Sequence, residues 1–572
     1  MIPSGYKEDT VYSVVPSDGS GDLSFTRASN GTRVNSAGLV EVTPWNLVTY
    51  SEELNNSGWA ATATITANTT TNPINGATNA DTIAGSGFIG QNLASVGVNT
   101  FSVYAKANSV AVIRLNIYDG ANDRGADYNL TTGAITNGYG SPLALNSESV
   151  GNGWWRISIT TNNANYSWVQ IHRDSSGTCY IWGAQLNIGA TAKPYFPTTD
   201  RLNVPRLTYQ NGGGGCPSLL LEKQSTNLIL QSEDFTSASW GINAAATRTA
   251  NTAISPDGTQ NADSIGANGG TTASIYQNIS ASGSGSYSVS VYAKKNTNRY
   301  FKLVITGGAS NSQRYGIIVD LQDGSFVTAL NTSTALTNTS YSIISAGNGW
   351  YRIAVTATVP SSSDVFIVLD NTNSSSNATS ATTLDYITPS VGNSYYWGAQ
   401  GEASSYPTSY IPTTSSSATR VADACFKTGI SSLIGQTEGV LFCDISGESL
   451  EDGARYMSIG VSGDGANRLV IYQGSGLINV YCGVGATFNF AYNPPSGRLK
   501  MAIAYKSGDY AFYVNGTQAA TNTLAAVPVC SELNIGLNEI LGFELPPNIT
   551  YNQCAVFKTR LSNSDLIALT TI

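Results

Sequence analysis

Apolar and polar residues alternate in short segments along the chain. One segment places Val103, Ala105 and Ala107 at every second position, and another places Ile157 and Ile159 in the same way. A period of two is typical of strands that are buried on one face only. Because these segments are regularly spaced and lack helical periodicity, they predict an all-β fold of tandem antiparallel β-sandwich, or jelly-roll, domains.

The pattern also repeats on a larger scale. The phrase Asn-Leu-Val-Thr-Tyr-Ser-Glu-Glu at 46–53 returns at 227–234 as Asn-Leu-Ile-Leu-Gln-Ser-Glu-Asp. Further matches follow in the same order: Trp59 with Trp240, 80–83 with 262–265, 102–106 with 290–294, 151–157 with 347–353, and 180–185 with 395–400. An ordered series of this kind predicts two copies of a whole domain and not a solenoid of short repeats.

These patterns divide the chain into five parts. We expect an N-terminal attachment or docking segment, a first β-sandwich module, a strap linker, a second β-sandwich module and a C-terminal concanavalin-A-like jelly roll, at 1–45, 46–200, 201–226, 227–415 and 416–572. The apolar run 219–221 predicts a strap that is pinned to a module. The range 360–382, rich in Ser, Thr and Asn, is expected to hold a long loop.

The C-terminal part differs from the two copies because it contains no tryptophan. Its strand candidates are 439–444, 468–472, 499–505 and 510–516, the last of which ends in the turn-forming pair Asn515-Gly516. Near the end of the chain, Ser562 stands three residues before Asp565. This spacing predicts a short helix with an N-terminal cap.

Composition and charge narrow the range of partners. Charged residues make up 11% of the chain, against ~25% in an average protein, and the net charge is −9. Because no Lys/Arg cluster is present, we expect no nucleic-acid partner. No apolar run approaches the ~20 residues of a membrane span, so no membrane partner is expected. The first residues lack the basic start and the apolar stretch of a signal peptide.

Cysteine and histidine usage argues against a metal centre. The chain has seven cysteines and no Cys-x-x-Cys motif, which favours reduced, mostly buried thiols in a protein assembled in a cytoplasm. A zinc site is disfavoured because His172 is the only histidine. We therefore predict no metal and no other cofactor.

Candidate catalytic groups are few. Glycoside hydrolysis needs two carboxyl groups about 5 Å or about 6.5–9.5 Å apart. The cluster at 448–452 reads as a loop, and the pairs Glu52-Glu53 and Glu233-Asp234 recur in both copies, so we interpret all of them as structural. His172 is interpreted as an edge or surface histidine, and no Walker, Rossmann or EF-hand motif occurs. The sequence predicts no enzymatic activity and no catalytic residue.

Aromatic residues provide a better candidate site. Flat aromatic faces stack on sugar rings, while amide and other polar groups bind the hydroxyls. Trp168 has no clear counterpart in the second copy and shares one face of a predicted strand with Gln170 and His172. We therefore nominate Trp168, Gln170 and His172 as glycan-binding residues. The recurring tryptophans interpreted as core residues are Trp154, Trp182, Trp350 and Trp397.

Several motifs resemble those of known families. The repeated phrase, together with Trp397-Gly398-Ala399-Gln400 and Ser409-Tyr410-Ile411-Pro412-Thr413 of the second copy, resembles the head spike fibre domain of tailed phages, which also occurs in tail fibres. The opening at 3–7, 12–16 and 25–29 and the strap at 205–209 and 216–222 look like fibre proteins of crAss-like and related Bacteroidetes phages. Residues 510–516 and 556–562 resemble concanavalin-A-like (laminin-G-like) jelly rolls. The first copy departs from the phage pattern at 193–198, where Lys-Pro-Tyr-Phe-Pro-Thr replaces Ser-Tyr-Ile-Pro-Thr.

The resemblance implies a structural surface fibre or spike subunit of a tailed-phage virion that is assembled in the host cytoplasm. The lack of coiled-coil heptads and of a collagen-like stalk favours a head (capsid) fibre over a receptor-binding tail fibre. The implied partners are phage capsid or tail proteins, host-surface polysaccharide and further copies of the chain, with a trimer as the expected homo-oligomer. A polysaccharide depolymerase and a secreted bacterial carbohydrate-binding protein remain as alternatives.

Receptor-specific chemistry is expected where the two copies differ. Tryptophans and carboxylates that survive in both copies are better explained as scaffold. The places that differ are the strand at 168–174, the range 360–382 and the unpaired C-terminal jelly roll.

Overall fold

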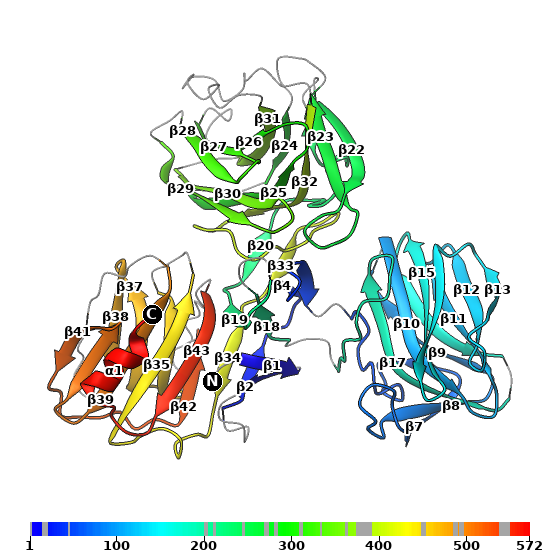
Figure 1. Ribbon diagram of the computed structural model, residues 1–572, viewed down its shortest axis with the longest axis horizontal. Coiled ribbons are helices and arrows are strands. Elements are labelled where there is room, and N and C mark those ends of the chain that lie inside the picture. The colour runs from blue at the N-terminus through cyan, green and yellow to red at the C-terminus, as the bar shows by residue number, and fades with distance from the viewer. Residues whose placement is uncertain are drawn as a thin grey trace. The chain divides into compact units, whose positions relative to one another are not determined.

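The computed structural model (Figure 1) describes the chain outside residues 1–2, 8, 14–20, 44–45, 96, 175, 200–203, 210–212, 243–245, 268–273, 280–283, 308–312, 332–334, 361–363, 373–391, 448–452, 484–489, 491–496 and 537–548. The secondary structure of the described residues consists of antiparallel strands and one short helix, α1 (Asn563–Thr570). The prediction of an all-β fold is confirmed.

The chain forms two compact units. Pro44–Leu202 is one unit, which we call module 1, and Met1–Thr43 together with Asn203–Ile572 is the other, which we call the larger unit. The larger unit contains a second sandwich, module 2 (strands between Gly241 and Glu402), and the C-terminal jelly roll. Module 1 is therefore an insertion between two parts of the larger unit.

Module 1 is a sandwich of two six-stranded antiparallel sheets. In spatial order the first sheet consists of β14 (Ala144–Gly151), β15 (Trp154–Asn163), β10 (Gly97–Ala107), β17 (Thr178–Ile188), β8 (Ala80–Ala84) and β7 (Thr64–Thr70). The second sheet consists of β13 (Ile135–Tyr139), β12 (Asp123–Asn129), β11 (Val112–Tyr118), β16 (Ser167–Arg173), β9 (Gly87–Leu93) and β6 (Ala60–Ala61). Val103 and Ile157, predicted from the alternation to be buried, lie in the core between the sheets.

Module 2 repeats this strand order. Its first sheet consists of β29 (Thr337–Ser345), β30 (Trp350–Val359), β25 (Gly285–Lys295), β32 (Gly392–Glu402), β23 (Ala262–Ala267) and β22 (Ala246–Ala253). Its second sheet consists of β28 (Ser325–Asn331), β27 (Gln313–Asp320), β26 (Tyr300–Gly307), β31 (Phe366–Thr372), β24 (Ser274–Asn278) and β21 (Gly241–Ile242). Each strand has a counterpart in module 1 at the same place in its sheet, as two copies of one domain require.

Strand β31 lies within 360–382, the range that we expected to hold a long loop. Phe366–Thr372 is a central strand between β24 and β26. The physical reason is the run Val365–Leu369, where alternate residues enter the module 2 core. Residues 361–363 and 373–382 lie outside the described part of the chain.

The duplicated phrase recurs because its polar side chains bond to the backbone of the fold. Asn46 Nδ2 donates to the carbonyl oxygens of Ala184 and Phe196 at 3.0 and 2.8 Å. Its counterpart, Asn227, donates to the carbonyl oxygens of Ala399 and Ile411 at 3.1 and 2.8 Å. These bonds tie the start of each module to its last strand and to the segment that follows that strand, so the phrase is part of the scaffold.

The glycine of the repeated Trp-Gly-Ala-Gln motif also has a structural role. Gly183 and Gly398 both have φ +63°, and a β-bulge interrupts the ladder beside each of them. A Cβ atom at Gly183 would lie 3.0 Å from the ring of Tyr104, and one at Gly398 would lie 3.0 Å from the ring of Tyr292. A larger residue would be strained in both copies.

The C-terminal jelly roll packs an eight-stranded sheet on a seven-stranded sheet. The first consists of β1 (Pro3–Lys7), β2 (Thr10–Ser13), β3 (Leu23–Thr26), β34 (Ala424–Lys427), β42 (Glu532–Ile535), β36 (Arg455–Val461), β37 (Asp464–Gly474) and β38 (Leu477–Cys482). The second consists of β18 (Arg206–Thr208), β19 (Ser218–Leu221), β43 (Ile549–Phe557), β35 (Glu438–Ser446), β39 (Leu499–Lys506), β40 (Tyr510–Val514) and β41 (Thr517–Asn522). Two small sheets pair β4 (Gly31–Val34) with β5 (Val40–Thr43) and β20 (Ser225–Asn227) with β33 (Ala418–Arg420).

Distant segments complete this jelly roll. Phe25 of β3 pairs with Cys425 of β34, and Leu219 of β19 pairs with Tyr551 of β43. Phe25 and Leu219 are fully buried in the same core cluster. The strap is thus pinned, as its apolar run predicted, and the N-terminal segment docks on the C-terminal domain.

The terminal helix α1 covers the outer face of the seven-stranded sheet. Leu566 packs there against Val440 and Phe442. Ser562 is the N-cap, and its hydroxyl accepts a hydrogen bond from the backbone N–H of Asp565 at 3.2 Å. The helix and its cap were predicted from this spacing, and both are confirmed.

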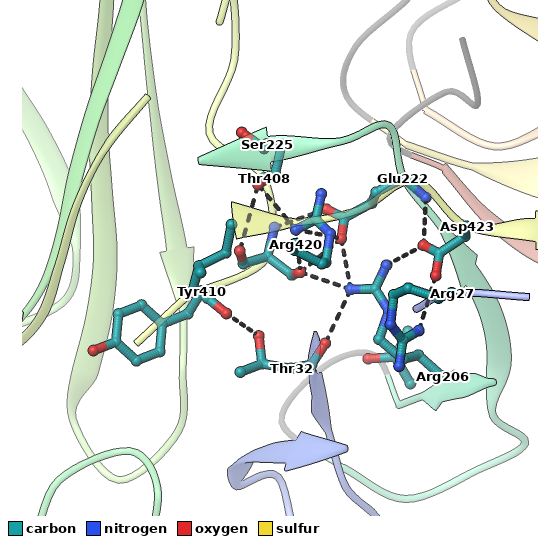
Figure 2. A network of polar contacts seen from close by, with 12 residues as sticks. Arg27, Thr32, Arg206, Glu222, Ser225, Thr408, Tyr410, Arg420 and Asp423 are labelled. Atoms are coloured by element: carbon teal, nitrogen blue, oxygen red, sulfur yellow. Dashed lines mark hydrogen bonds and ion pairs between the residues drawn. The ribbon is translucent and has the colours of Figure 1, made fainter. Parts of the chain in front are cut away.

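Five charged side chains are buried together in the larger unit (Figure 2) and form what we call the arginine hub. Its members are Arg27, Arg206, Glu222, Arg420 and Asp423. Arg27 Nη1 lies 2.8 Å from Asp423 Oδ1, and Arg206 also forms an ion pair with Asp423. Glu222 Oε2 lies 2.6 Å from Arg206 Nη1 and 3.1 Å from Arg420 Nη1. The hub joins the N-terminal segment, the strap and the segment after module 2.

Charge and burial oppose each other in this hub. Burial alone would raise the pKa of Glu222, but Arg420 and Arg206 outweigh it and lower the pKa from 4.5 to about 2. Burial lowers the pKa of Arg27 to about 10, although Asp423 opposes the shift. The buried charges are stable only as a set, because removal of one leaves the others uncompensated.

We expect Glu222→Gln to destabilise the larger unit by about 3–5 kcal/mol at pH 7, the usual cost of breaking a buried ion pair. The folded pKa of Glu222 is depressed, so its contribution is complete above about pH 4.5 and is lost as the pH falls toward about 2. The difference in unfolding free energy between wild type and variant should therefore narrow over that range in urea titrations.

Glu438→Gln is the matched control. The ion pair between Glu438 and Lys506 is 29% and 52% exposed, so its loss should cost less than about 1 kcal/mol. If the unfolding free energies of wild type and Glu222→Gln changed with pH in parallel, the prediction would be contradicted.

Candidate functional site

Strand β16 carries all three residues nominated from the sequence on one face. Val169 and Ile171 enter the core of module 1, so Trp168, Gln170 and His172 lie on the opposite, outward face of the sheet. The strand lies between β11 and β9, which means that His172 is not at a sheet edge. Trp168 and His172 are half-buried, and Gln170 is buried.

Two buried amides form the floor of this face. Asn116 Nδ2 donates to Gln170 Oε1 at 2.8 Å, and His172 Nε2 lies 2.9 Å from the same oxygen. The Tyr139 hydroxyl donates to Asn116 Oδ1 at 2.7 Å. Asn116 and Gln170 are only 4% and 6% exposed, so the floor is ordered before any ligand arrives.

Aromatic side chains surround this amide floor. The Trp168 ring lies edge to face with Phe88, with centroids 5.8 Å apart, and with Tyr118, with centroids 6.4 Å apart. Tyr118 in turn contacts Tyr166 at 6.2 Å. These contacts hold Trp168 in one orientation at the surface. We call the outward surface formed by the amide floor, the aromatic side chains and Arg114 the β16 face. Its residues are Phe88, Arg114, Asn116, Tyr118, Tyr139, Trp168, Gln170 and His172.

The charges at one end of the face leave a small excess of negative charge. Arg114 lies 2.7 Å from carboxylate oxygens of both Asp127 and Asp174. The hydrogen bond to Asp127 is the main cause of a raised Arg114 pKa. Burial lowers the pKa of His172 below 6.5, although the charge of Asp174 opposes this shift. His172 is therefore neutral at pH 7, and the two carboxylates outnumber the single cation.

Two glycines leave room for the large side chains of the face. A Cβ atom at Gly125 would lie 2.6 Å from the Tyr139 hydroxyl oxygen. One at Gly90 would lie 2.7 Å from the Val169 carbonyl oxygen and 3.1 Å from Trp168 Nε1. Tyr139 and Trp168 pack closely over the sheet because these positions lack a side chain.

The corresponding face of module 2 is built differently. The register pairs Tyr118 with Trp168 in module 1 and Thr306 with Phe366 in module 2, so Phe366 is the counterpart of Trp168. Equivalent hydrogen bonds support this alignment. Arg173 on β16 donates to the carbonyl oxygen of Ile83, and Asn371 on β31 donates to that of Ile265.

In module 2 an apolar floor replaces the amide floor. Val304 and Val368 stand where module 1 has Asn116 and Gln170. Tyr276 occupies the position of Gly90, and its ring lies 6.1 Å from Phe366. Val304 is 2% exposed and Val368 is half-buried, so the two floors differ in their chemistry and not in their depth. Among the described residues, the positions of Asn116 and Gln170 are apolar in module 2, although Lys302 and Asp370 form an ion pair further along the same face.

The recurring carboxylates serve the scaffold, as predicted for Glu52-Glu53 and Glu233-Asp234. Glu52 accepts hydrogen bonds from Asn79 and Tyr195, and Glu233 accepts them from their counterparts, which are Asn261 and Tyr410. The cluster at 448–452 lies outside the described residues.

Two further carboxylates have shifted pKa values at equivalent positions. Burial raises the pKa of Asp81 and of Asp263 to about 6. Asp81 accepts hydrogen bonds from the backbone N–H groups of Leu54 and Asn68, and Asp263 accepts the same pair of bonds in module 2. Each side chain is 1% exposed and therefore has no access to a substrate.

The recurring tryptophans are core residues, as predicted. Trp154 and Trp182 pack with Tyr104 in module 1, and Trp350 and Trp397 pack with the equivalent tyrosine in module 2. Six of the seven cysteines are buried and all are free thiols. Among the described residues, no group of three or more His, Cys, Asp or Glu side chains is placed to hold a metal.

The sequence nominated one strand of the β16 face and missed its neighbours. Asn116 and Tyr118 lie on β11, where Ile113, Leu115 and Ile117 face the core. That alternation was available in the sequence and places Asn116 and Tyr118 on the outward side. What the sequence lacked was the pairing of β11 with β16, which joins segments more than 50 residues apart.

Comparison with known proteins yields fold-level likeness only. No protein-family model and no curated protein matches the chain. Among solved structures, the Ruminococcus gnavus IT-sialidase CBM40 bound to α2,3-sialyllactose is 17% identical, with 24% of this chain and 84% of that chain covered and a TM-score of 0.22. The CBM22-1–CBM22-2 tandem of Paenibacillus barcinonensis Xyn10C is 12% identical, with 63% and 97% covered and a TM-score of 0.22.

A third similar structure is domains LG4-5 of the mouse laminin α1 chain. It is 10% identical, with 56% of this chain and 90% of that chain covered and a TM-score of 0.16. TM-scores this low assign no ligand or activity to the chain. In the described part of the chain, no helix has the length and hydropathy needed to cross a bilayer.

The single histidine allows a direct test of the electrostatics of the β16 face. We expect an NMR titration of His172 to give a pKa below 6.5, because burial disfavours the imidazolium. Asp174→Asn should lower the pKa further, since the Asp174 charge is the main factor that raises it. Asp323→Asn, in module 2, should have no effect, and a His172 pKa above 6.5 would contradict the geometry.

Proposed function

We propose that module 1 binds a glycan through the β16 face. The observation that carries this proposal is the amide floor of Asn116 and Gln170 beside the ordered ring of Trp168. The indole supplies an apolar surface for a sugar ring, while the amides, Tyr139 and His172 supply donors and acceptors for hydroxyl groups. Such a site is shallow, and it binds one or a few sugar units.

The charge of the face favours a neutral glycan. Asp127 and Asp174 flank the one cation, Arg114, and both already form ion pairs with it. A carboxylate or sulfate on the sugar would meet net negative charge and no free cation on this face. Neutral hexose or pentose units fit this arrangement better.

Binding without hydrolysis fits the same arrangement. On this face Asp127 and Asp174 form ion pairs with Arg114, which leave neither free as the proton donor that glycoside hydrolysis needs. Asp123 lies opposite Tyr118 on the same face and would act without the second free carboxyl group that the reaction requires. The buried Asp81 is not accessible to a substrate. Module 1 therefore acts as a binding module in this proposal.

Trp168→Ala should lower the affinity for a neutral glycan about tenfold or more, which corresponds to about 1.4 kcal/mol. Phe366→Ala is the matched control because it changes the equivalent position of module 2. It should leave the affinity unchanged, since the apolar floor beside it offers no hydrogen bonds. Ligands from a glycan array would be measured by calorimetry against both variants, and equal affinities for all three proteins would remove the β16 face from the site.

At the level of the particle, we propose that the chain is a trimeric surface fibre of a tailed-phage virion, on the head and not at the tail tip. The support is the resemblance of the duplicated phrase and the opening segment to phage fibre proteins. Closed symmetry would place three weak glycan sites on one fibre, and several fibres on one virion would add avidity. The glycan-binding proposal does not depend on this assignment.

Cryo-electron microscopy of the particle tests the assignment. We expect three copies of the chain around one axis, at capsid positions, and a mass of three chains for the purified protein in light scattering. Density at the tail tip would favour a receptor-binding tail fibre. Absence of the chain from purified virions would overturn the virion role and leave the glycan-binding test unaffected.

A further inference from the structure

Two arginines that form no ion pair with a described residue lie on the outer face of the eight-stranded jelly-roll sheet. Arg455 on β36 and Arg468 on β37 are half-buried. No ion pair links either of them to another described residue, whereas the hub arginines and Arg498 all have carboxylate partners.

Tyrosine rings hold both guanidinium groups in place. Arg455 Cζ lies 4.7 Å from the centre of the Tyr472 ring, and Arg468 Cζ lies 4.3 Å from the centre of the Tyr481 ring. Contact with a ring face orders a guanidinium without using its N–H groups. No hydrogen bond to a described residue engages a side-chain donor of either arginine, and Arg468 Nε is buried without a partner.

Unsatisfied polar groups share this face. Ser458 lies opposite both Asn534 and Val470 in the register, and Val470 lies opposite Tyr481. Ser458 and Asn534 are 0% and 1% exposed, and neither Ser458 Oγ nor Asn534 Nδ2 has a hydrogen-bond partner among the described residues. Buried donors without partners are rare in folded proteins, and an absent ligand is one cause.

The local charge supports the same interpretation. Burial lowers the pKa of Arg455, and the neighbouring charge of Arg468 lowers it further. Glu532 lies on the same face, opposite Gly460, but forms no ion pair with Arg468. Asp464 is engaged locally, since it accepts a hydrogen bond from Asn467 at 2.7 Å. The two cations are thus mutually repelling and lack a counter-ion among the described residues.

From this geometry we propose an oxyanion site on the outer face of β36, β37 and β42, formed by Arg455, Arg468, Ser458 and Asn534. Its ligand is the carboxylate or sulfate group of an acidic polysaccharide. A guanidinium fork matches a planar carboxylate or two oxygens of a sulfate, and the serine and amide donors complete the shell. The site complements the β16 face, which disfavours the same groups.

The test uses the full-length protein and three polymers, which are polygalacturonate, dextran sulfate and uncharged dextran. We expect the wild type to bind one or both charged polymers, with an affinity that falls as salt rises, and not to bind dextran through this site. Arg455→Met and Arg468→Met should each weaken binding at least tenfold in affinity electrophoresis. Arg498→Met, which removes a cation already paired with Asp444, should retain wild-type affinity.

Two controls separate the possible outcomes. The first control adds sodium sulfate or sodium phosphate at millimolar concentration. If these salts compete with the polymers and bind as tightly per charged group, the site binds free anions. That result would overturn the polysaccharide assignment. If an arginine variant has a lowered melting temperature, Ser458→Ala replaces it and should weaken binding about threefold. Equal binding by wild type and all variants would overturn the site, and Trp168→Ala should leave this binding unchanged in every case.

Discussion

The architecture of the larger unit depends on the burial of five charges in one place. Arg27, Arg206 and Arg420 come from three separate segments, and Glu222 and Asp423 bridge them. Burial of an unpaired ion is very costly, so any arrangement that separates these segments exposes the hub to that cost. The hub therefore specifies the fold, because its charges are all paired in only one arrangement of the N-terminal segment, the strap and the chain after module 2. In a protein with 11% charged residues, few other ion pairs are available for this task.

Local features of the fold could be predicted from the sequence, and long-range ones could not. The alternation at Val103 and Ile157 predicted buried strand faces, and Ser562 with Asp565 predicted the terminal helix. Both patterns involve only a few consecutive residues. The hub could not be predicted, since Arg27 and Asp423 are 396 positions apart and no local pattern marks either residue. Phe366 was not identified as the counterpart of Trp168, because the polar residues on both sides of β31 have the sequence pattern of a loop.

The candidate site shows the same division. Trp168, Gln170 and His172 were found from one strand, whereas Asn116 and Tyr139 became visible only when the register of β11, β12 and β13 was known. Comparison of the two copies shows where their outer faces differ. Val304 and Val368 replace two amides, and Tyr276 replaces a glycine, so an apolar floor stands in module 2 where module 1 has a polar one. Duplication thus preserved the scaffold while each outer face acquired its own chemistry.

The insertion of module 1 into the larger unit has a consequence for the order of folding during synthesis. At about 5–20 residues per second, a ribosome needs roughly 20–80 s to add the 396 positions between Arg27 and Asp423. Until then the hub lacks its central carboxylate, and strand β3 has no partner in β34. Module 1 has no such dependence, because its two sheets are formed from one continuous stretch, and it can fold while the rest is still being made. The nascent chain therefore carries a folded module 1 while strands β1 to β3, which pair with one another, still lack β34. The jelly roll that incorporates them is the last part of the protein to become stable.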